Sequence, residues 1–195
     1  MLNLSKIEFM QQEINKALQV LKEGGLILYP TDTVWGIGCD ATNAEAVKKV
    51  YTLKQREDCK ALICLVADDR MLKKYVNKVP EVALNILDVT DKPTTIIYDD
   101  AQNLASNLIA EDGTIAIRIP DDEFCFQLCR KLNGAVVSTS ANISGVPTPK
   151  SFKEISPAIL KGVDYVVNLH HEKICNKPSS IIKLSNNGVI KIIRE

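Results

Sequence analysis

Apolar residues in the first 22 positions recur at steps of three and four, and polar residues fill the positions between them. The stripe consists of Ile7, Met10, Ile14, Ala17, Leu18 and Leu21. This spacing is typical of one face of an amphipathic helix, and Gly24-Gly25 would end that helix. The sequence therefore predicts a helix over about residues 7–22.

The pattern then changes to short, continuous apolar runs. The runs Leu26–Tyr29 and Ala61–Val66 are bounded by turn residues, which favours buried strands. A polar turn, Pro30–Thr33, follows the first run. Between the two runs a helical pattern extends from Asn43, a good N-cap residue, to about Leu53.

Helices and strands continue to intermix through the rest of the chain. Further strands are expected within 92–98, 113–120, 135–138 and 165–169, helices after Asp68, Pro80, Asp122 and Ser156, and a hairpin of Ser180–Leu184 with Val189–Ile193. This mixture predicts an α/β (α+β) fold on a twisted mixed sheet. Residues 1–195 are expected to form a single domain.

Composition narrows the class of protein. Hydrophobic residues make up 46% and charged residues 25% of the 195 positions, as in ordinary globular proteins. Lys+Arg and Asp+Glu are equal at 24 each, so the overall charge does not indicate a nucleic-acid or anionic-membrane partner. The sequence shows neither a secretory signal nor an apolar run of about 18 residues, the length that spans a bilayer. A cytoplasmic protein without a membrane partner is expected.

The six cysteines are dispersed and do not have the paired spacing of a metal site. Cys125 and Cys129 stand four apart on a predicted helix, which favours two small side chains facing the core. His170 and His171 are the only histidines and lie far from that pair in the sequence. We therefore predict reduced cysteines and no protein-bound metal.

Three groups of residues indicate chemistry. The first is the turn Thr31-Asp32-Thr33 together with the cations Lys54, Arg56 and Lys60, which follow the helix that starts at Asn43. Cations there could simply favour a helix C-terminus, or they could form a clamp for phosphate or carboxylate. A strand, turn and helix carrying hydroxyls and cations suit an anionic small molecule.

The second group is Arg118, which alternates with isoleucines in an apolar strand and has Thr114 on the same side by period two. A charge in that place faces solvent, pairs with a carboxylate or lines a polar cavity. The third group is Ser138–Asn142, which crowds the end of a buried strand. Such residues make local turns, but they also stand where open α/β sheets bind ligands. Ser179 begins the terminal hairpin in a similar way.

Common catalytic motifs are missing from the chain. It contains no G-x-x-x-x-G-K-[ST] phosphate loop, no G-x-G-x-x-G, no G-x-S-x-G and no His/Cys cluster. If the protein is an enzyme, we expect it to act by positioning its substrates and neutralising their charge.

In combination these motifs resemble the YrdC-like (TsaC-type) family of threonylcarbamoyl-AMP synthases, in its single-domain form. The matching pieces are YPTDTVWGIGCDA at 29–41, Lys54 with Arg56, Ser140 with Asn142 followed by Ile-Ser-Gly, AIRIP at 116–120, PSSII at 178–182 and Arg194. The family's K-x-R…S-x-N tetrad is filled in order.

The resemblance implies a twisted sheet flanked by helices around a large cationic cavity. It also implies a nucleotidyltransferase reaction in which threonine, bicarbonate and ATP, with Mg2+ on the nucleotide, give threonylcarbamoyl-AMP and pyrophosphate. This is the first step of threonylcarbamoyladenosine modification at position 37 of tRNA, so transient contact with tRNA or tRNA-modifying proteins is expected.

The resemblance also implies roles for individual residues. Lys54 and Arg56 would meet the nucleotide phosphates, Ser140 and Asn142 would hold threonine and nucleotide, and these four would be the catalytic set. The substrate-binding set would be Thr33, Lys60, Thr114, Arg118, Ser179 and Arg194. Lys54→Ala or Arg56→Ala is expected to abolish turnover with little change in thermal stability, whereas a large loss of stability would mark the residue as structural.

Some positions depart from the family pattern. Trp35 replaces a tyrosine, so an aromatic wall is expected to remain without the hydroxyl. Glu57 and Asp58 place acid beside the cations, and Leu65 stands near the position of a histidine. Two other functions remain open. One is an RNA-binding module, which the neutral charge and 5% aromatic content disfavour. The other is a carbamoyl-adenylate-handling domain of the kind found within longer hydrogenase-maturation proteins.

Overall fold

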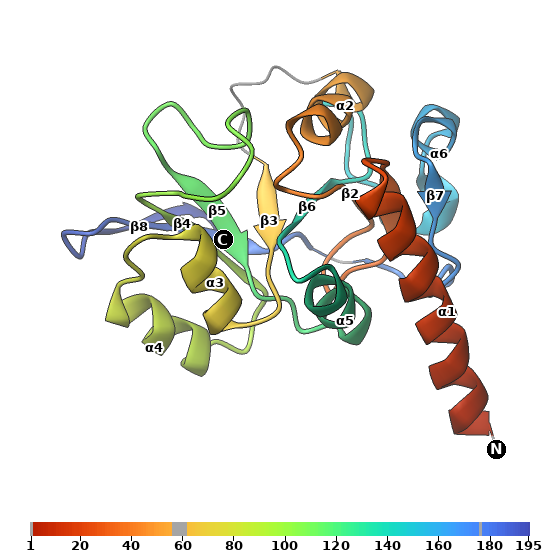
Figure 1. Ribbon diagram of the computed structural model, residues 1–195, viewed down its shortest axis with the longest axis horizontal. Coiled ribbons are helices and arrows are strands. Elements are labelled where there is room, and N and C mark those ends of the chain that lie inside the picture. The colour runs from red at the N-terminus through yellow and green to blue at the C-terminus, as the bar shows by residue number, and fades with distance from the viewer. Residues whose placement is uncertain (1, 56–61, 176) are drawn as a thin grey trace.

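The structure, a computed structural model, describes residues 2–55, 62–175 and 177–195 (Figure 1). Its centre is a mixed nine-stranded sheet in the order β7-β1-β2-β6-β3-β5-β4-β8-β9. The strands are β1 (Ile27–Tyr29), β2 (Gly36–Gly38), β3 (Ile63–Leu65), β4 (Thr94–Tyr98), β5 (Ile115–Arg118), β6 (Val136–Ser140), β7 (Tyr165–Val166), β8 (Ser180–Leu184) and β9 (Ile190–Arg194). The predicted α/β class with a mixed sheet is confirmed.

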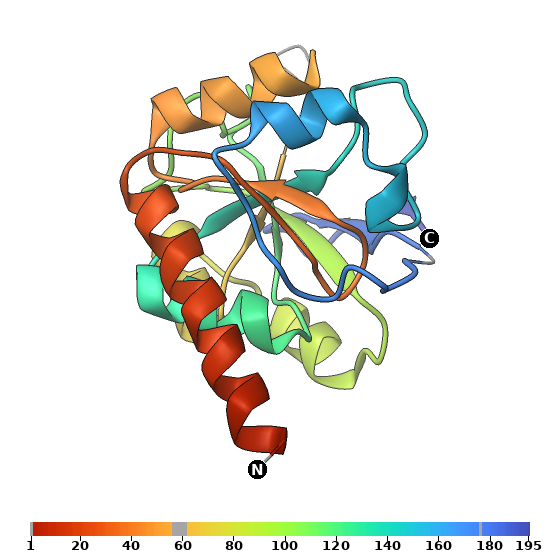
Figure 2. The same ribbon diagram turned by 90° about the vertical axis from the view of Figure 1, so that its right-hand side faces the viewer.

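Helices lie on both faces of this sheet, which gives the three layers visible in Figure 2. They are α1 (Leu2–Lys22), α2 (Ala44–Lys54), α3 (Asp69–Tyr75), α4 (Glu81–Val89), α5 (Glu123–Leu132), the 3-10 turn η1 (Phe152–Glu154) and α6 (Pro157–Gly162). The pair α2 and α6 covers one face, and α1, α3, α4 and α5 cover the other. Both faces are therefore shielded, as the continuous apolar strands require.

The predicted starts of α2, α3 and α5 are confirmed by their caps. The side chain of Asn43 accepts a hydrogen bond from the Ala46 N–H at 3.1 Å, and Asp122 accepts one from Cys125 at 3.0 Å. Asp68 caps α3 in the same way. Each carboxylate or amide satisfies one of the N–H groups that a helix start leaves unpaired.

Strand β2 was not predicted, because it has only three residues and two of them are glycine. A Cβ atom on Gly38 would lie 2.7 Å from the ring of Tyr29 and 2.8 Å from the carbonyl oxygen of Val137. Glycine at that position allows β1, β2 and β6 to approach closely, although it weakens the strand signal in the sequence. Several expected boundaries also differ: α1 begins at Leu2 rather than near Ile7, β6 extends to Ser140, and β7 ends at Val166.

Helix α1 is fastened to the β7 edge of the sheet by a buried carboxylate. Glu13 accepts hydrogen bonds from the Tyr165 hydroxyl at 2.5 Å and the Asn168 N–H at 2.7 Å, and Lys16 lies 3.1 Å away. Burial alone would raise the pKa of Glu13, but these partners outweigh it and hold the pKa below its ordinary value.

The core is one connected cluster of apolar side chains that runs from α1 to β8. It includes Cys125 and Cys129, as the helical spacing predicted. All five cysteines that the structure describes are unbridged and buried, and burial raises the pKa of each thiol. They are packing residues rather than reactive thiols.

The sheet register gathers the polar positions. Gly36 of β2 pairs with Ser140 of β6, while Ile63 of β3 lies opposite Ser138 on one side and Ala116 on the other. Segments far apart in the sequence therefore present their side chains at one place on the sheet.

Candidate active site

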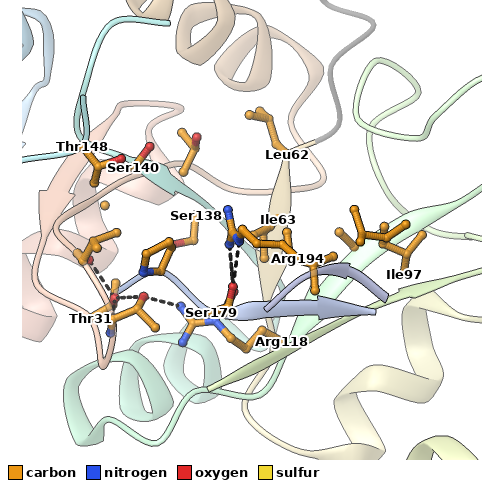
Figure 3. A pocket seen from close by; sticks show the side chains of 18 residues that line it. Thr31, Leu62, Ile63, Ile97, Arg118, Ser138, Ser140, Thr148, Ser179 and Arg194 are labelled. Carbon is orange, nitrogen blue, oxygen red and sulfur yellow. Dashed lines mark hydrogen bonds between the residues drawn. The ribbon is translucent and has the colours of Figure 1, made fainter. Parts of the chain in front are cut away.

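A cavity of about 250 Å³ lies over this part of the sheet (Figure 3). Its lining consists of seven hydroxyl residues, two arginines and nine apolar or glycine residues: Thr31, Thr33, Val34, Gly36, Leu62, Ile63, Ile97, Ala116, Arg118, Ser138, Thr139, Ser140, Thr148, Pro178, Ser179, Ile181, Ile193 and Arg194. No carboxylate lines it within the described part of the chain. Its volume is slightly below the roughly 300–1,000 Å³ that is usual for ligand pockets.

One wall of the cavity is the turn between β1 and β2. The Thr31 hydroxyl donates to the Val34 carbonyl oxygen at 2.8 Å, accepts from the Thr33 N–H at 3.1 Å and lies 3.0 Å from the Thr33 hydroxyl. These local bonds hold a compact hydroxyl-rich turn. Thr33, predicted as substrate-binding, is 7% exposed and faces the cavity.

Arg118 supplies a cation from the end of β5. Its guanidinium forms an ion pair with Asp32 and donates to the Thr33 hydroxyl at 3.3 Å. The side chain is 4% exposed. Of the three environments expected for this charge, the structure shows two, because Arg118 both pairs with a carboxylate and lines the cavity.

Arg194 supplies the second cation, from β9. It donates from Nε and Nη2 to the carbonyl oxygen of Ser179 at 3.0 and 2.7 Å, and these bonds appear as dashed lines in Figure 3. The Ser179 hydroxyl lies 2.7 Å from that of Thr95. Burial and, after it, the charge of Arg118 lower the pKa of Arg194. The two guanidinium groups therefore repel each other across one site, which a bound anion would relieve.

Lys54 has a different position from the one the sequence suggested. It is 1% exposed, and its ammonium donates to the carbonyl oxygens of Ser140 at 2.5 Å and Asn142 at 2.6 Å. The Ser144 N–H in turn donates to the Lys54 carbonyl oxygen at 2.8 Å. The side chain does not line the cavity and instead ties α2 to the loop after β6.

The other two members of the tetrad stand at the end of β6 and in the loop that follows it. Ser140 lines the cavity. Asn142 does not, and its amide nitrogen donates to the carbonyl oxygens of Ile143 at 3.0 Å and Val146 at 2.7 Å. Among the described residues no partner meets its buried amide oxygen. Since both bonded neighbours are acceptors, this orientation of the amide is the consistent one.

Two expectations about the lining are not met. Thr114, which directly precedes β5, does not line the cavity, and its hydroxyl donates to Asp112 at 2.6 Å. This hydrogen bond, together with Lys183, lowers the pKa of Asp112 to about 2. Trp35 was expected as an aromatic wall. It is fully buried away from the cavity, with ring centroids 5.0 Å from Phe152 and 5.5 Å from His171.

Two predicted residues, Arg56 and Lys60, lie outside the described residues, as do Glu57 and Asp58. The cavity also includes Thr148 and Pro178, which the sequence reasoning did not select. A proline-rich loop signal existed at 147–149, but nothing in the pattern indicated which way that loop turns.

Hydroxyl donors and two arginines around an apolar floor suit a small anion with hydrogen-bonding groups. Within the described chain, no three His, Cys, Asp or Glu side chains are placed to hold a metal ion. None of the helices in that part of the chain is both long and apolar enough to cross a membrane.

Fold and cavity together define an α/β protein with a polar cavity whose lining runs from Thr31 to Arg194. The sequence profile of the Sua5/YciO/YrdC family, described as "Telomere recombination", matches residues 19–195. The chain belongs to this family.

Comparison with individual relatives agrees. The chain is 37% identical over 191 residues to a protein of Methanocaldococcus jannaschii, covering 95% of this chain and 88% of that one. It is 34% identical to the threonylcarbamoyl-AMP synthase of Idiomarina loihiensis, covering 86% of this chain and 91% of the relative.

Among solved structures, E. coli YciO superposes with a TM-score of 0.83 at 26% identity, covering 95% of this chain and 89% of that chain. P. abyssi Sua5 complexed with L-threonine superposes with a TM-score of 0.77 at 25% identity. That match covers 88% of this chain but only 50% of the Sua5 chain, so this chain spans about half of that neighbour's length.

Proposed function

We propose that this protein is a threonylcarbamoyl-AMP synthase. In this reaction the amine of threonine attacks bicarbonate, water is lost, and an oxygen of the resulting carbamate attacks the α-phosphorus of ATP. Pyrophosphate leaves, and a mixed anhydride, threonylcarbamoyl-AMP, forms. The product would serve threonylcarbamoyladenosine synthesis in tRNA, which makes contact with tRNA or tRNA-modifying proteins a further expectation.

The observation that carries the proposal is the convergence of Arg118, Arg194 and seven hydroxyls in one cavity of a chain 34–37% identical to its relatives. The reaction brings a carbamate and a polyphosphate together, and both are anions. Cations and fixed hydroxyl donors lower the cost of that approach. The chain would supply this stabilisation by geometry rather than through a covalent intermediate.

The position of each residue in the cavity determines the role that we propose for it. Arg118 and Thr33 would bind the carboxylate of threonine, because they present a guanidinium and a hydroxyl at one wall. Arg194, Ser140 and Ser179 would face the nucleotide side of the cavity. Lys54 would act on the site by fixing the backbone of Ser140 and Asn142. Phosphate contacts by Arg56 and Lys60 remain proposals based on the motif alone.

Mg2+ is expected to arrive on ATP, since the lining offers hydroxyls and guanidinium groups rather than carboxylates. The metal would balance phosphate charge, while the protein orients threonine and excludes water. A cytoplasmic location fits the buried, unbridged thiols and stays a prediction.

The test is a reaction with ATP, Mg2+, bicarbonate and threonine, from which each component is omitted in turn. Pyrophosphate and an adenylate of the expected mass should appear only in the complete mixture. Arg194→Ala should lower kcat/KM by about tenfold or more. Arg70→Ala, which removes an exposed arginine from α3, is the matched control and should not.

Three results would redirect the proposal. ATP binding without product would point to a domain that only holds an adenylate. Salt-sensitive RNA binding without any ATP binding would favour the RNA-binding module. Equal loss of activity in both arginine variants would mean that activity does not depend specifically on the arginine of the cavity.

A further inference from the structure

The carboxylate of Asp32 lies directly behind the cavity wall. It is 7% exposed, pairs with the guanidinium of Arg118 through Oδ1, and accepts the Asp121 N–H through Oδ2 at 3.3 Å. Its neighbours on both sides, Thr31 and Thr33, line the cavity, whereas Asp32 does not. The carboxylate therefore contacts a cavity residue without facing the ligand space itself.

On its other side Asp32 borders a second, wider cavity of about 700 Å³ between α3, α4 and the loop after β5. Lys173 also borders this second cavity and donates to the Thr31 carbonyl oxygen at 2.8 Å. Groups of two separate segments, 118–121 and Lys173, therefore hold the turn 30–34 from behind.

The ion pair fixes the direction of the guanidinium. Arginine has five N–H donors in a rigid plane, so binding one edge to a carboxylate sets the direction of the others. Arg118 uses Nη1 on Asp32 and Nη2 on Thr33. A buried arginine without such a partner would carry an uncompensated charge and could choose among several rotamers.

Resting on the proposed function, we propose that Asp32 is the positioning residue of the threonine subsite. It orients Arg118 and couples it to Thr33, so that the carboxylate of threonine meets a guanidinium and a hydroxyl already in place. Asp32 does not touch the substrate, and its effect on threonine passes through Arg118.

Two variants separate orientation from charge. Asp32→Asn removes the charge, and Asp32→Glu keeps it but displaces the carboxylate by one methylene, for which the second cavity gives room. Both should weaken threonine binding in calorimetry, by about tenfold to a hundredfold for the asparagine variant and less for the glutamate variant. ATP affinity should stay within about twofold of wild type. Asp112→Asn, at an exposed carboxylate that pairs with Lys183, is the matched control.

A double-variant cycle tests the route of the effect. In an Arg118→Ala background, Asp32→Asn should cause no further loss of threonine affinity. Wild-type affinity in both Asp32 variants, or an additive loss in the double variant, would overturn the proposal. Wild-type threonine affinity in Asp32→Glu alone would also overturn it, because charge and not direction would then suffice.

A second measurement does not depend on the substrate. NMR of the Arg118 guanidinium should show hindered rotation in the wild type and faster rotation in both Asp32 variants. If the wild type binds no threonine, the proposed function fails, and the rotation data still decide the positioning role. Equal rotation rates in all three proteins would refute it.

Discussion

The burial of Lys54 leads to a prediction opposite to the one the sequence suggested. Replacing it with methionine keeps the apolar stem but removes both bonds to the Ser140 and Asn142 carbonyl oxygens. Hydrogen bonds to a charged group contribute roughly 1.5–3 kcal/mol each, and the loss is offset because an ammonium no longer needs to be buried. We expect a net loss of about 3 kcal/mol in the free energy of unfolding.

For a chain of this size such a loss lowers Tm by roughly 6–12 °C. Calorimetric melting and urea unfolding of Lys54→Met measure it. Lys49→Met is the matched control, because Lys49 also lies on α2 and also donates to one carbonyl oxygen, that of Gly24, but is exposed. That variant should stay within about 1 kcal/mol of wild type.

The reasoning fails if Lys54→Met melts within about 2 °C of wild type. In that case the bonds to Ser140 and Asn142 would contribute little, and the ammonium would be available to the nucleotide, as the motif alone implied. If both lysine variants melt equally low, loss of any lysine from α2 would explain the effect.

Three further predictions concern other parts of the molecule. The pKa of Glu13 is lowered in the folded state, so its contribution to stability is complete above its ordinary pKa of 4.5 and is lost as the pH falls through the lower, folded value. In Glu13→Gln, the free energy of unfolding measured in urea should therefore depend less on pH below 4.5 than in the wild type. Gly38→Ala should lower the free energy of unfolding by about 1–3 kcal/mol, because its Cβ would meet backbone, whereas Gly134→Ala, with 3.4 Å or more around its Cβ, should not. Ser140→Ala should cut kcat by about tenfold with Tm within about 2 °C of wild type, and an equally large drop in Tm would contradict a role in the site.

Local chemistry explains which parts of the fold could be predicted. Helix starts at Asn43 and Asp122 depend on capping bonds within three residues, so the sequence contains the whole signal. Strand β2 depends on contacts with β1 and β6, and these contacts leave little space for a side chain at its glycines. No local pattern could reveal it.

The same distinction applies to the site. The need of Arg118 for a polar partner could be predicted, because a charge inside an apolar strand requires one whichever fold surrounds it. The direction of Lys54 could not be predicted, because the carbonyl oxygens it binds belong to residues more than eighty positions away in the sequence. The sequence indicated Asp32 only as part of a polar turn. Its importance depends on the position of Arg118, which lies on strand β5.

The order of strands in the sheet has a consequence for how the protein forms. Two of the strand pairs that contribute residues to the cavity join distant segments: β2 with β6, and β4 with β8. Chains dominated by such non-local pairing fold slowly, because closing a long loop costs entropy before the strand contacts that offset this cost can form. The helices, which rely on local bonds, can form earlier. During refolding, the helical circular-dichroism signal should therefore recover before the cavity regains its ability to bind a ligand, because the cavity forms only when these distant strands have paired.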